Sequence, residues 1–83
     1  MDFLLEEEMI DILTFCLQNP NSNENDLKKQ RLKEIGVELF TDGGVDALEN
    51  FFFVVENRII GEIEKSPKPF RYLWNGISNE WNY

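Results

Sequence analysis

The residues of this sequence that could take part in chemistry are one cysteine and two groups of carboxylates. The cysteine is Cys16, the first group is Glu6, Glu7, Glu8 and Asp11, and the second is the pair Asp42 and Asp46 on either side of two glycines. Carboxylates can bind metal ions or transfer protons, and a thiolate can act as a nucleophile. The chain contains no histidine, so the most common general base and metal ligand of proteins is missing.

None of these residues has the neighbours that its chemistry needs. Cys16 lies on an apolar helical face without a histidine to activate it, which predicts a buried structural thiol. The glutamates lack the Glu-x-x-His pattern of di-metal bundles, so we expect them on a solvated face. Asp42 and Asp46 do not fit the spacing of a calcium loop, and "DGG" lacks the lysine of a phosphate loop. We therefore expect no enzyme, metal site, cofactor or small-molecule substrate.

Composition predicts one globular domain over residues 1–83 with an acidic surface. Of the 83 residues, 42% are hydrophobic, and 16 acidic residues stand against 8 basic ones for a net charge of −8. Binding to a nucleic-acid backbone or an anionic membrane needs clustered cations, so both partners are disfavoured. The same charge favours a partner protein that is partly basic.

The expected location is the cytoplasm. A single cysteine allows no internal disulfide, which fits a reducing compartment. The opening residues "MDFLLEEEMI" lack the basic region of a signal peptide, and no apolar run approaches the roughly 20 residues of a membrane span.

Hydrophobic periodicity predicts an all-α fold, a small compact bundle or array of about four helices. We expect helices at Asp2–Gln18, about Asp26–Thr41, about Val45–Lys65, and about Pro69–Asn75 with a short continuation to Trp81. Asn19-Pro20 and Gly43-Gly44 break the pattern between them. Gly36 costs helix propensity inside the second segment, which indicates close approach of another element.

The third segment has an alternative interpretation as two strands. "FFFVV" and "RIIGEI" are rich in β-branched and aromatic residues, and Glu56-Asn57 between them could form a turn. Glu-Asn is not a favoured hairpin turn, and a hairpin would lack a third strand. An unbroken apolar stripe from Leu48 to Ile63 favours the helix.

The last eleven residues, "LWNGISNEWNY", hold both tryptophans of the chain. Trp74 and Trp81 share one apolar stripe with Phe70, so we expect both indoles in the core. The alternative is an exposed tail that offers its aromatic side chains to a partner. Gly76 is either a close-contact site or a helix stop after which Ile77 folds back.

Several large apolar side chains fall outside the predicted core stripes. They form the candidate partner interface: Leu4, Phe15, Phe53, Ile60, Tyr72 and Tyr83. The chain is similar in size, charge and helical character to the immunity proteins of bacterial nuclease toxins. This is a general similarity, and no sequence motif supports it. We expect a small acidic non-enzymatic interaction module, of inhibitor, immunity or adaptor type, that binds a larger, partly basic protein. The alternative is a self-associating structural or accessory subunit, a homodimer.

Overall fold

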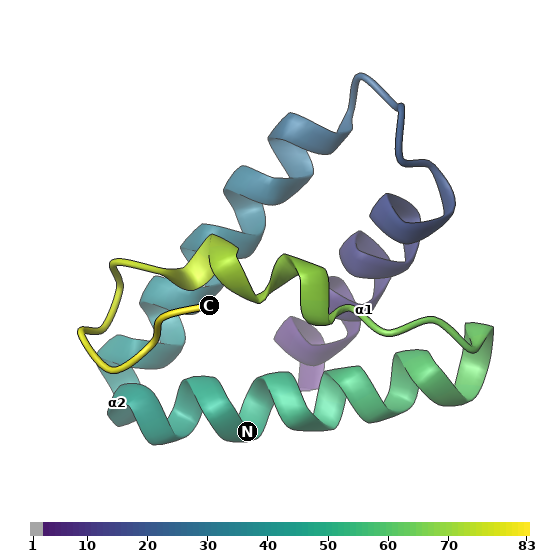
Figure 1. Ribbon diagram of the computed structural model, residues 1–83. Coiled ribbons are helices and arrows are strands. Elements are labelled where there is room, and N and C mark those ends of the chain that lie inside the picture. Colours follow the sequence, from purple (N-terminus) through teal and green to yellow (C-terminus); the bar gives the residue numbers. More distant parts are fainter. Residues whose placement is uncertain (1–2) are drawn as a thin grey trace.

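The computed structural model describes residues 3–83 and shows an all-α fold. It contains an α-helix α1 (Phe3–Gln18), a long α-helix α2 (Asn25–Ile63) and a 3-10 helix η1 (Lys68–Trp74), with no strand among the described residues (Figure 1). The helical interpretation of Phe51 to Ile63 is therefore confirmed, and the strand alternative is wrong. Across residues 3–83, no helix combines the length and hydrophobicity needed to cross a bilayer.

The prediction of about four helices is corrected to three, because α2 runs through the glycine pair without a loop. Gly44 alone leaves helical geometry, at φ 70° and ψ −160°, and the helix turns sharply back there (Figure 1). We call residues 25–43 the first arm and residues 45–63 the second arm. A pattern of apolar residues detects the break in direction, but it cannot tell a loop from a single bent residue.

The backbone angles of Gly44 lie in a region that is essentially restricted to glycine, since a Cβ there collides with the neighbouring peptide groups. We therefore expect Gly44→Ala to lower the free energy of unfolding by about 1–3 kcal/mol. Gly61→Ala is the matched control, because Gly61 lies within the second arm and a Cβ there meets nothing within 4 Å. Urea unfolding followed by circular dichroism measures both, and equal effects would contradict the role given to Gly44.

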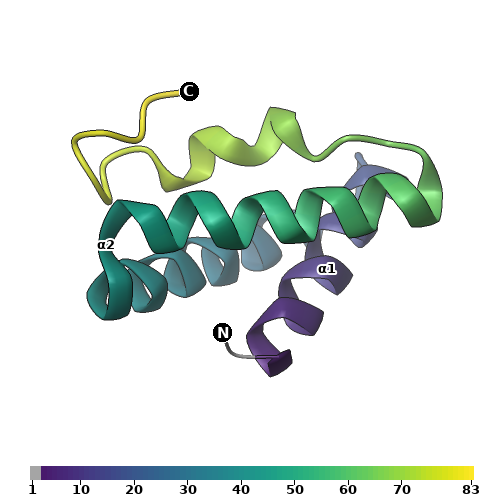
Figure 2. The ribbon, with the colours of Figure 1, turned by 90° about the horizontal axis from the view of Figure 1, so that it is seen from below.

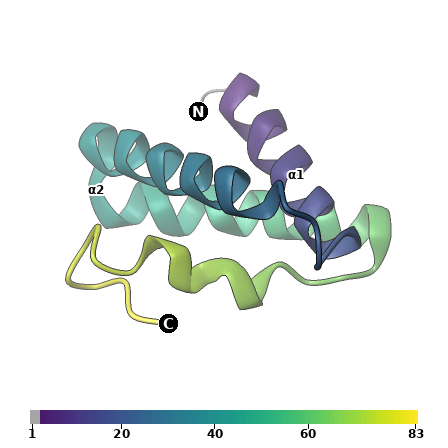
Figure 3. The same ribbon diagram turned by 90° about the horizontal axis from the view of Figure 1, so that it is seen from above.

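The core lies between α1, the two arms of α2 and the C-terminal segment. Figure 3 shows α1 lying across the two arms, with the C-terminal segment along their other side. The buried apolar residues are Met9, Ile10, Ile12, Leu13, Cys16, Leu32, Ile35, Leu48, Phe51, Phe52, Val55, Ile59, Trp74 and Trp81. The stripes predicted for α1 and for the second arm are thus the buried faces.

The C-terminal segment differs from its prediction in helix type and length. A 3-10 helix, η1, replaces the expected α-helix, and the chain continues in turns instead of a helical extension to Trp81. Pro67 and Pro69 stand at the start of η1, where the N–H groups of a helix have no partner within it, so they mark its beginning. The chain leaves helical geometry at Asn75, at ψ 136°, and Gly76 follows at φ 91°. Of the two roles considered for Gly76, the stop is confirmed. Figure 2 shows η1 running back along the second arm toward the bend.

Gly36 and Trp74 explain how this irregular segment is held. The indole Nε1 of Trp74 donates a buried hydrogen bond of 2.9 Å to the carbonyl oxygen of Leu32. A Cβ placed on Gly36 would lie 2.6 Å from that nitrogen, so only glycine lets the ring approach the helix backbone. The close approach predicted at Gly36 is confirmed.

Candidate functional site

Cys16 and the carboxylates do not assemble a reactive centre. Cys16 is buried, and burial raises the pKa of its thiol above the ordinary value, which disfavours the thiolate. Within residues 3–83, no three His, Cys, Asp or Glu side chains lie close enough together to hold a metal ion. The position of Cys16 agrees with a structural thiol.

The glutamates of the first group pair with arginines of α2 on a surface that is partly exposed. Arg58 lies 3.0 Å from Glu6 and 2.7 Å from Glu7. Arg31 donates two hydrogen bonds to Glu8, of 2.7 and 2.9 Å, and this pairing lowers the pKa of the Glu8 carboxyl. These contacts span 23 or more residues of sequence. Sequence spacing within one helix gives no signal for them.

The structure does not bring the six candidate interface residues onto one surface. Phe53 and Ile60 do share a face of the second arm, and they are 66% and 41% exposed. Leu4 is exposed at the start of α1, and Tyr72 is exposed on η1. Phe15 is half-buried and has the Lys28 ammonium 4.5 Å above its ring.

Tyr83 belongs to an aromatic cluster that fastens the C-terminal segment. Its ring lies 4.9 Å from that of Trp81, and the Arg71 guanidinium stacks 4.1 Å from its centroid. Arg71 also binds Glu49 at 2.8 Å, and the Tyr83 hydroxyl donates to the same carboxylate. Although more than half of Tyr83 is exposed, these contacts give it a structural role that sequence position alone did not indicate.

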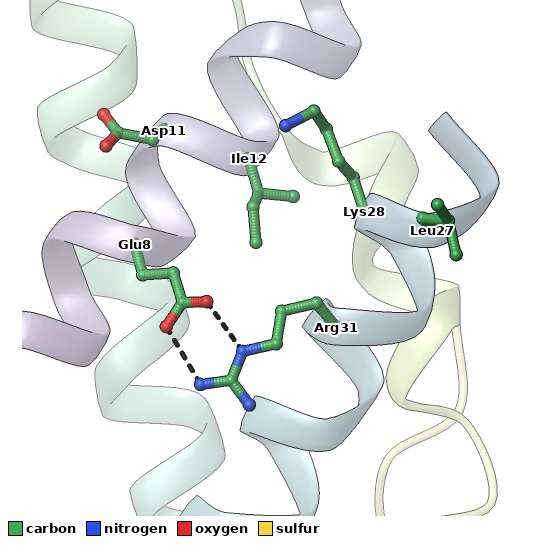
Figure 4. A pocket seen from close by; sticks show the side chains of 6 residues that line it. All are labelled: Glu8, Asp11, Ile12, Leu27, Lys28 and Arg31. Carbon is green, nitrogen blue, oxygen red and sulfur yellow. Dashed lines mark hydrogen bonds and ion pairs between the residues drawn. The ribbon is translucent and has the colours of Figure 1, made fainter. Parts of the chain in front are cut away.

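A seam runs between α1 and the first arm, and the Glu8–Arg31 pair spans it. Figure 4 shows this pair beside a hollow of about 360 Å³, where Ile12 of α1 faces Leu27 and Lys28 of α2. The hollow is lined by both acidic and basic groups, so it carries no strong preference for one sign of charge.

The other end of the seam, near the bend of α2, carries acidic side chains and no basic ones. Two hollows of about 410 and 360 Å³ open there and share Leu5, Glu38 and Asp42. We call their combined surface the bend groove; it is lined by Leu5, Val37, Glu38, Leu39, Thr41, Asp42, Gly43, Ala47, Asn50 and Phe51. Phe51 is buried, Leu39 is half-buried, and Val37 is 50% exposed. The groove therefore combines apolar walls with carboxylates and contains no lysine or arginine.

The acidity of this region extends beyond the groove. Between Lys33 and Arg58 the sequence holds six acidic residues and no basic one. Among residues 3–83, no ion pair joins Glu38, Asp42 or Asp46 to a cation. Apolar residues outside the predicted stripes do not indicate this groove, because most of its apolar lining belongs to the stripes themselves. The long interval without a cation was the signal that could have found it.

Comparison of the chain with protein-family models, with curated proteins and with solved structures yields no match. The role of the bend groove must therefore be argued from its own residues.

Proposed function

We propose that the chain is a non-enzymatic protein-interaction module whose bend groove binds a basic, partly apolar segment of a partner protein. The observation that carries the proposal is the joining of an apolar hollow to carboxylates that form no ion pair within residues 3–83. Free carboxylates on a surface are ordinary, and so is a shallow apolar hollow. Their combination is suited to a ligand that brings both an apolar side chain and positive charge.

The charged part and the apolar part of the groove have different roles in binding. Glu38 and Asp42 are exposed at the groove, where their charges attract a basic segment from a distance and accelerate association. Val37, which is 50% exposed, and the half-buried Leu39 offer apolar surface that a leucine or isoleucine of the partner could cover. Neither the carboxylates nor the apolar residues of the groove need to take part in a chemical reaction in these roles. This agrees with the proposal of a binding protein of the inhibitor or adaptor class.

The proposal predicts that reversing the groove charges weakens binding more than reversing charges elsewhere. The probe is a synthetic amphipathic peptide of leucine and lysine, titrated by calorimetry and by amide chemical shifts. The double variant Glu38→Lys/Asp42→Lys is compared with Glu64→Lys/Glu80→Lys, whose side chains are exposed away from the groove and give the same change in net charge. We expect the groove variant to bind about tenfold more weakly than the control, since a difference of about 1.4 kcal/mol is tenfold.

In the parent protein, the peptide should shift the amide signals of Gly43 and Ala47, which line the groove. Equal losses in the two double variants would show that only overall charge attracts the peptide, and the groove would then not be the site. A peptide of leucine and glutamate tests the sign of the ligand charge and should not bind.

We further propose that the protein acts in the cytoplasm. Support comes from the lone cysteine, whose buried thiol has no partner cysteine for a disulfide within the sequence.

A further inference from the structure

Two carboxylates stand between the two hollows of the bend groove. Glu38 and Asp42 line both hollows, and both side chains are exposed. The two residues are four apart in the first arm, so they are neighbours on one face of the helix, about 6 Å apart along its axis. We call this pair the acidic ridge.

The other residues that the first arm contributes to the groove fall on opposite sides of the acidic ridge. At about 100° per residue, Val37 and Thr41 lie about 80–120° to one side of its centre. Leu39 and Gly43 lie at the same angles on the other side. Val37 and Thr41 line the hollow of about 410 Å³, whereas Leu39 and Gly43 line the hollow of about 360 Å³. We call these the Val37 hollow and the Leu39 hollow, and the ridge separates them.

This arrangement sets an order for the groups of a complementary ligand. No ion pair of residues 3–83 includes Glu38 or Asp42, and a cation placed over the ridge reaches both carboxylates. Apolar side chains are best placed to either side of that cation, because the hollows with Val37 and Leu39 in their walls lie there. Across the first arm, the ligand should therefore present apolar, basic and apolar groups in turn.

A helix presents these groups better than an extended segment does. Residues 3–83 contain no strand, so an extended segment finds no strand edge to supply backbone hydrogen bonds. A helix satisfies its own backbone, and its residues i, i+3, i+4 and i+7 share one face. From i to i+7 the rise is about 10 Å, which is close to the diameter of about 10–12 Å of the helix that the ligand must cross.

From this geometry we propose that the partner segment is an amphipathic helix that crosses the first arm at the acidic ridge. A lysine or arginine at its i+3 or i+4 position lies over Glu38 and Asp42, and apolar residues at i and i+7 enter the two hollows. The proposal rests on the function proposed above and adds the conformation of the ligand and the order of its residues. The contact involves two turns of helix, so the complex is small and reversible.

Two alanine-based helical peptides of identical composition test the order of the ligand residues. The ordered peptide carries leucine at i and i+7 and lysine at i+3 and i+4. The reordered peptide carries leucine at i and i+3 and lysine at i+4 and i+7, so it cannot fill both hollows with its lysines on the ridge. By calorimetry the ordered peptide should bind about tenfold more tightly. It should also shift the amide signals of Thr41, in the Val37 hollow, and Ala47, in the Leu39 hollow, with one common affinity.

Removing the charges of the ridge should remove the preference for the ordered peptide. In Glu38→Gln/Asp42→Asn a central lysine has no carboxylate beneath it, so both peptides should bind weakly and about equally. The control Glu64→Gln/Glu80→Gln has the same change in net charge and should retain the preference. All four side chains are exposed, so the variants leave the core intact.

The outcomes separate this proposal from the one on which it rests. If the parent protein binds the two peptides equally, or if the shifts are confined to one hollow, the crossing helix is wrong, while the bend groove remains a site for basic segments. If the control variant loses the preference as fully as the ridge variant, the lysines do not lie over Glu38 and Asp42. A parent protein that binds neither peptide overturns both proposals.

Discussion

Trp81→Ala should lower the free energy of unfolding by about 3–5 kcal/mol, out of roughly 5–10 kcal/mol for a domain of this size. Trp81 is 0% exposed, and its ring centroid lies 5.2 Å from that of Trp74 and 6.0 Å from that of Phe52. Its indole nitrogen also donates a 2.7 Å hydrogen bond to the carbonyl oxygen of Arg71. Removing the ring leaves a cavity beside both aromatic neighbours and an unpaired carbonyl.

Urea unfolding monitored by circular dichroism measures this loss, and Tyr72→Ala is the control because Tyr72 is an exposed aromatic residue in the same segment. The control should change stability by less than about 1 kcal/mol. In the parent protein, tryptophan emission should be blue-shifted and protected from acrylamide, then shift to the red on unfolding. A Trp81→Ala variant as stable as the parent, with water-like emission from both indoles of the folded parent, would contradict the packed position of the C-terminal segment.

Gly36→Ala and Gly61→Ala should change stability in opposite directions, although both place alanine in the same helix. At Gly36 the new Cβ would lie 2.6 Å from Nε1 of Trp74 and 2.8 Å from Cδ1 of Ile77. The indole must move, which strains the core and loosens its hydrogen bond to Leu32. Overpacking costs about 1–3 kcal/mol and the weakened hydrogen bond costs about 1 kcal/mol, against a gain in helix propensity of about 1 kcal/mol.

The expected net loss at Gly36 is therefore about 1–3 kcal/mol. Gly61→Ala gains about 0.5–1 kcal/mol because nothing obstructs its Cβ and the unfolded chain loses freedom. Urea unfolding at a low protein concentration, where association is absent, gives both values. Should Gly36→Ala prove as stabilising as Gly61→Ala, the indole would not be packed on the helix backbone at this position.

The local sequence pattern was sufficient to predict the helices that bury one regular apolar face. The apolar spacing of α1 and of the second arm matches the buried residues, and the stripe through Phe70, Trp74 and Trp81 placed both indoles in the core. The pattern did not give the type of η1. The path of η1 follows the docking of the two indoles, which bond to the carbonyl oxygens of Leu32 and Arg71, and such docking sets no period in the sequence.

The candidate site was less predictable because its residues are far apart in the sequence. Val37 and Asp42 reach the same groove as Leu5 only after α1 packs on the first arm. The arginine pairs are equally non-local, since Arg58 binds glutamates about fifty residues away. Of the surfaces described, only the Phe53–Ile60 face could be predicted directly, because both residues lie on one helix.

The bend at Gly44 also bears on whether the two arms of one chain pack against each other or exchange with those of a second chain. If another residue made the bent geometry costly, α2 would extend into one straight helix of about 58 Å, compared with a longest molecular dimension of 30 Å. The second arm and the segment after it would then leave their own α1, and a second chain would supply the missing half. We therefore expect the bent conformation of Gly44 to disfavour domain swapping. A Gly44→Ala protein that is dimeric at a concentration where Gly61→Ala is monomeric would reveal such an exchange, and equal masses of the two would exclude it.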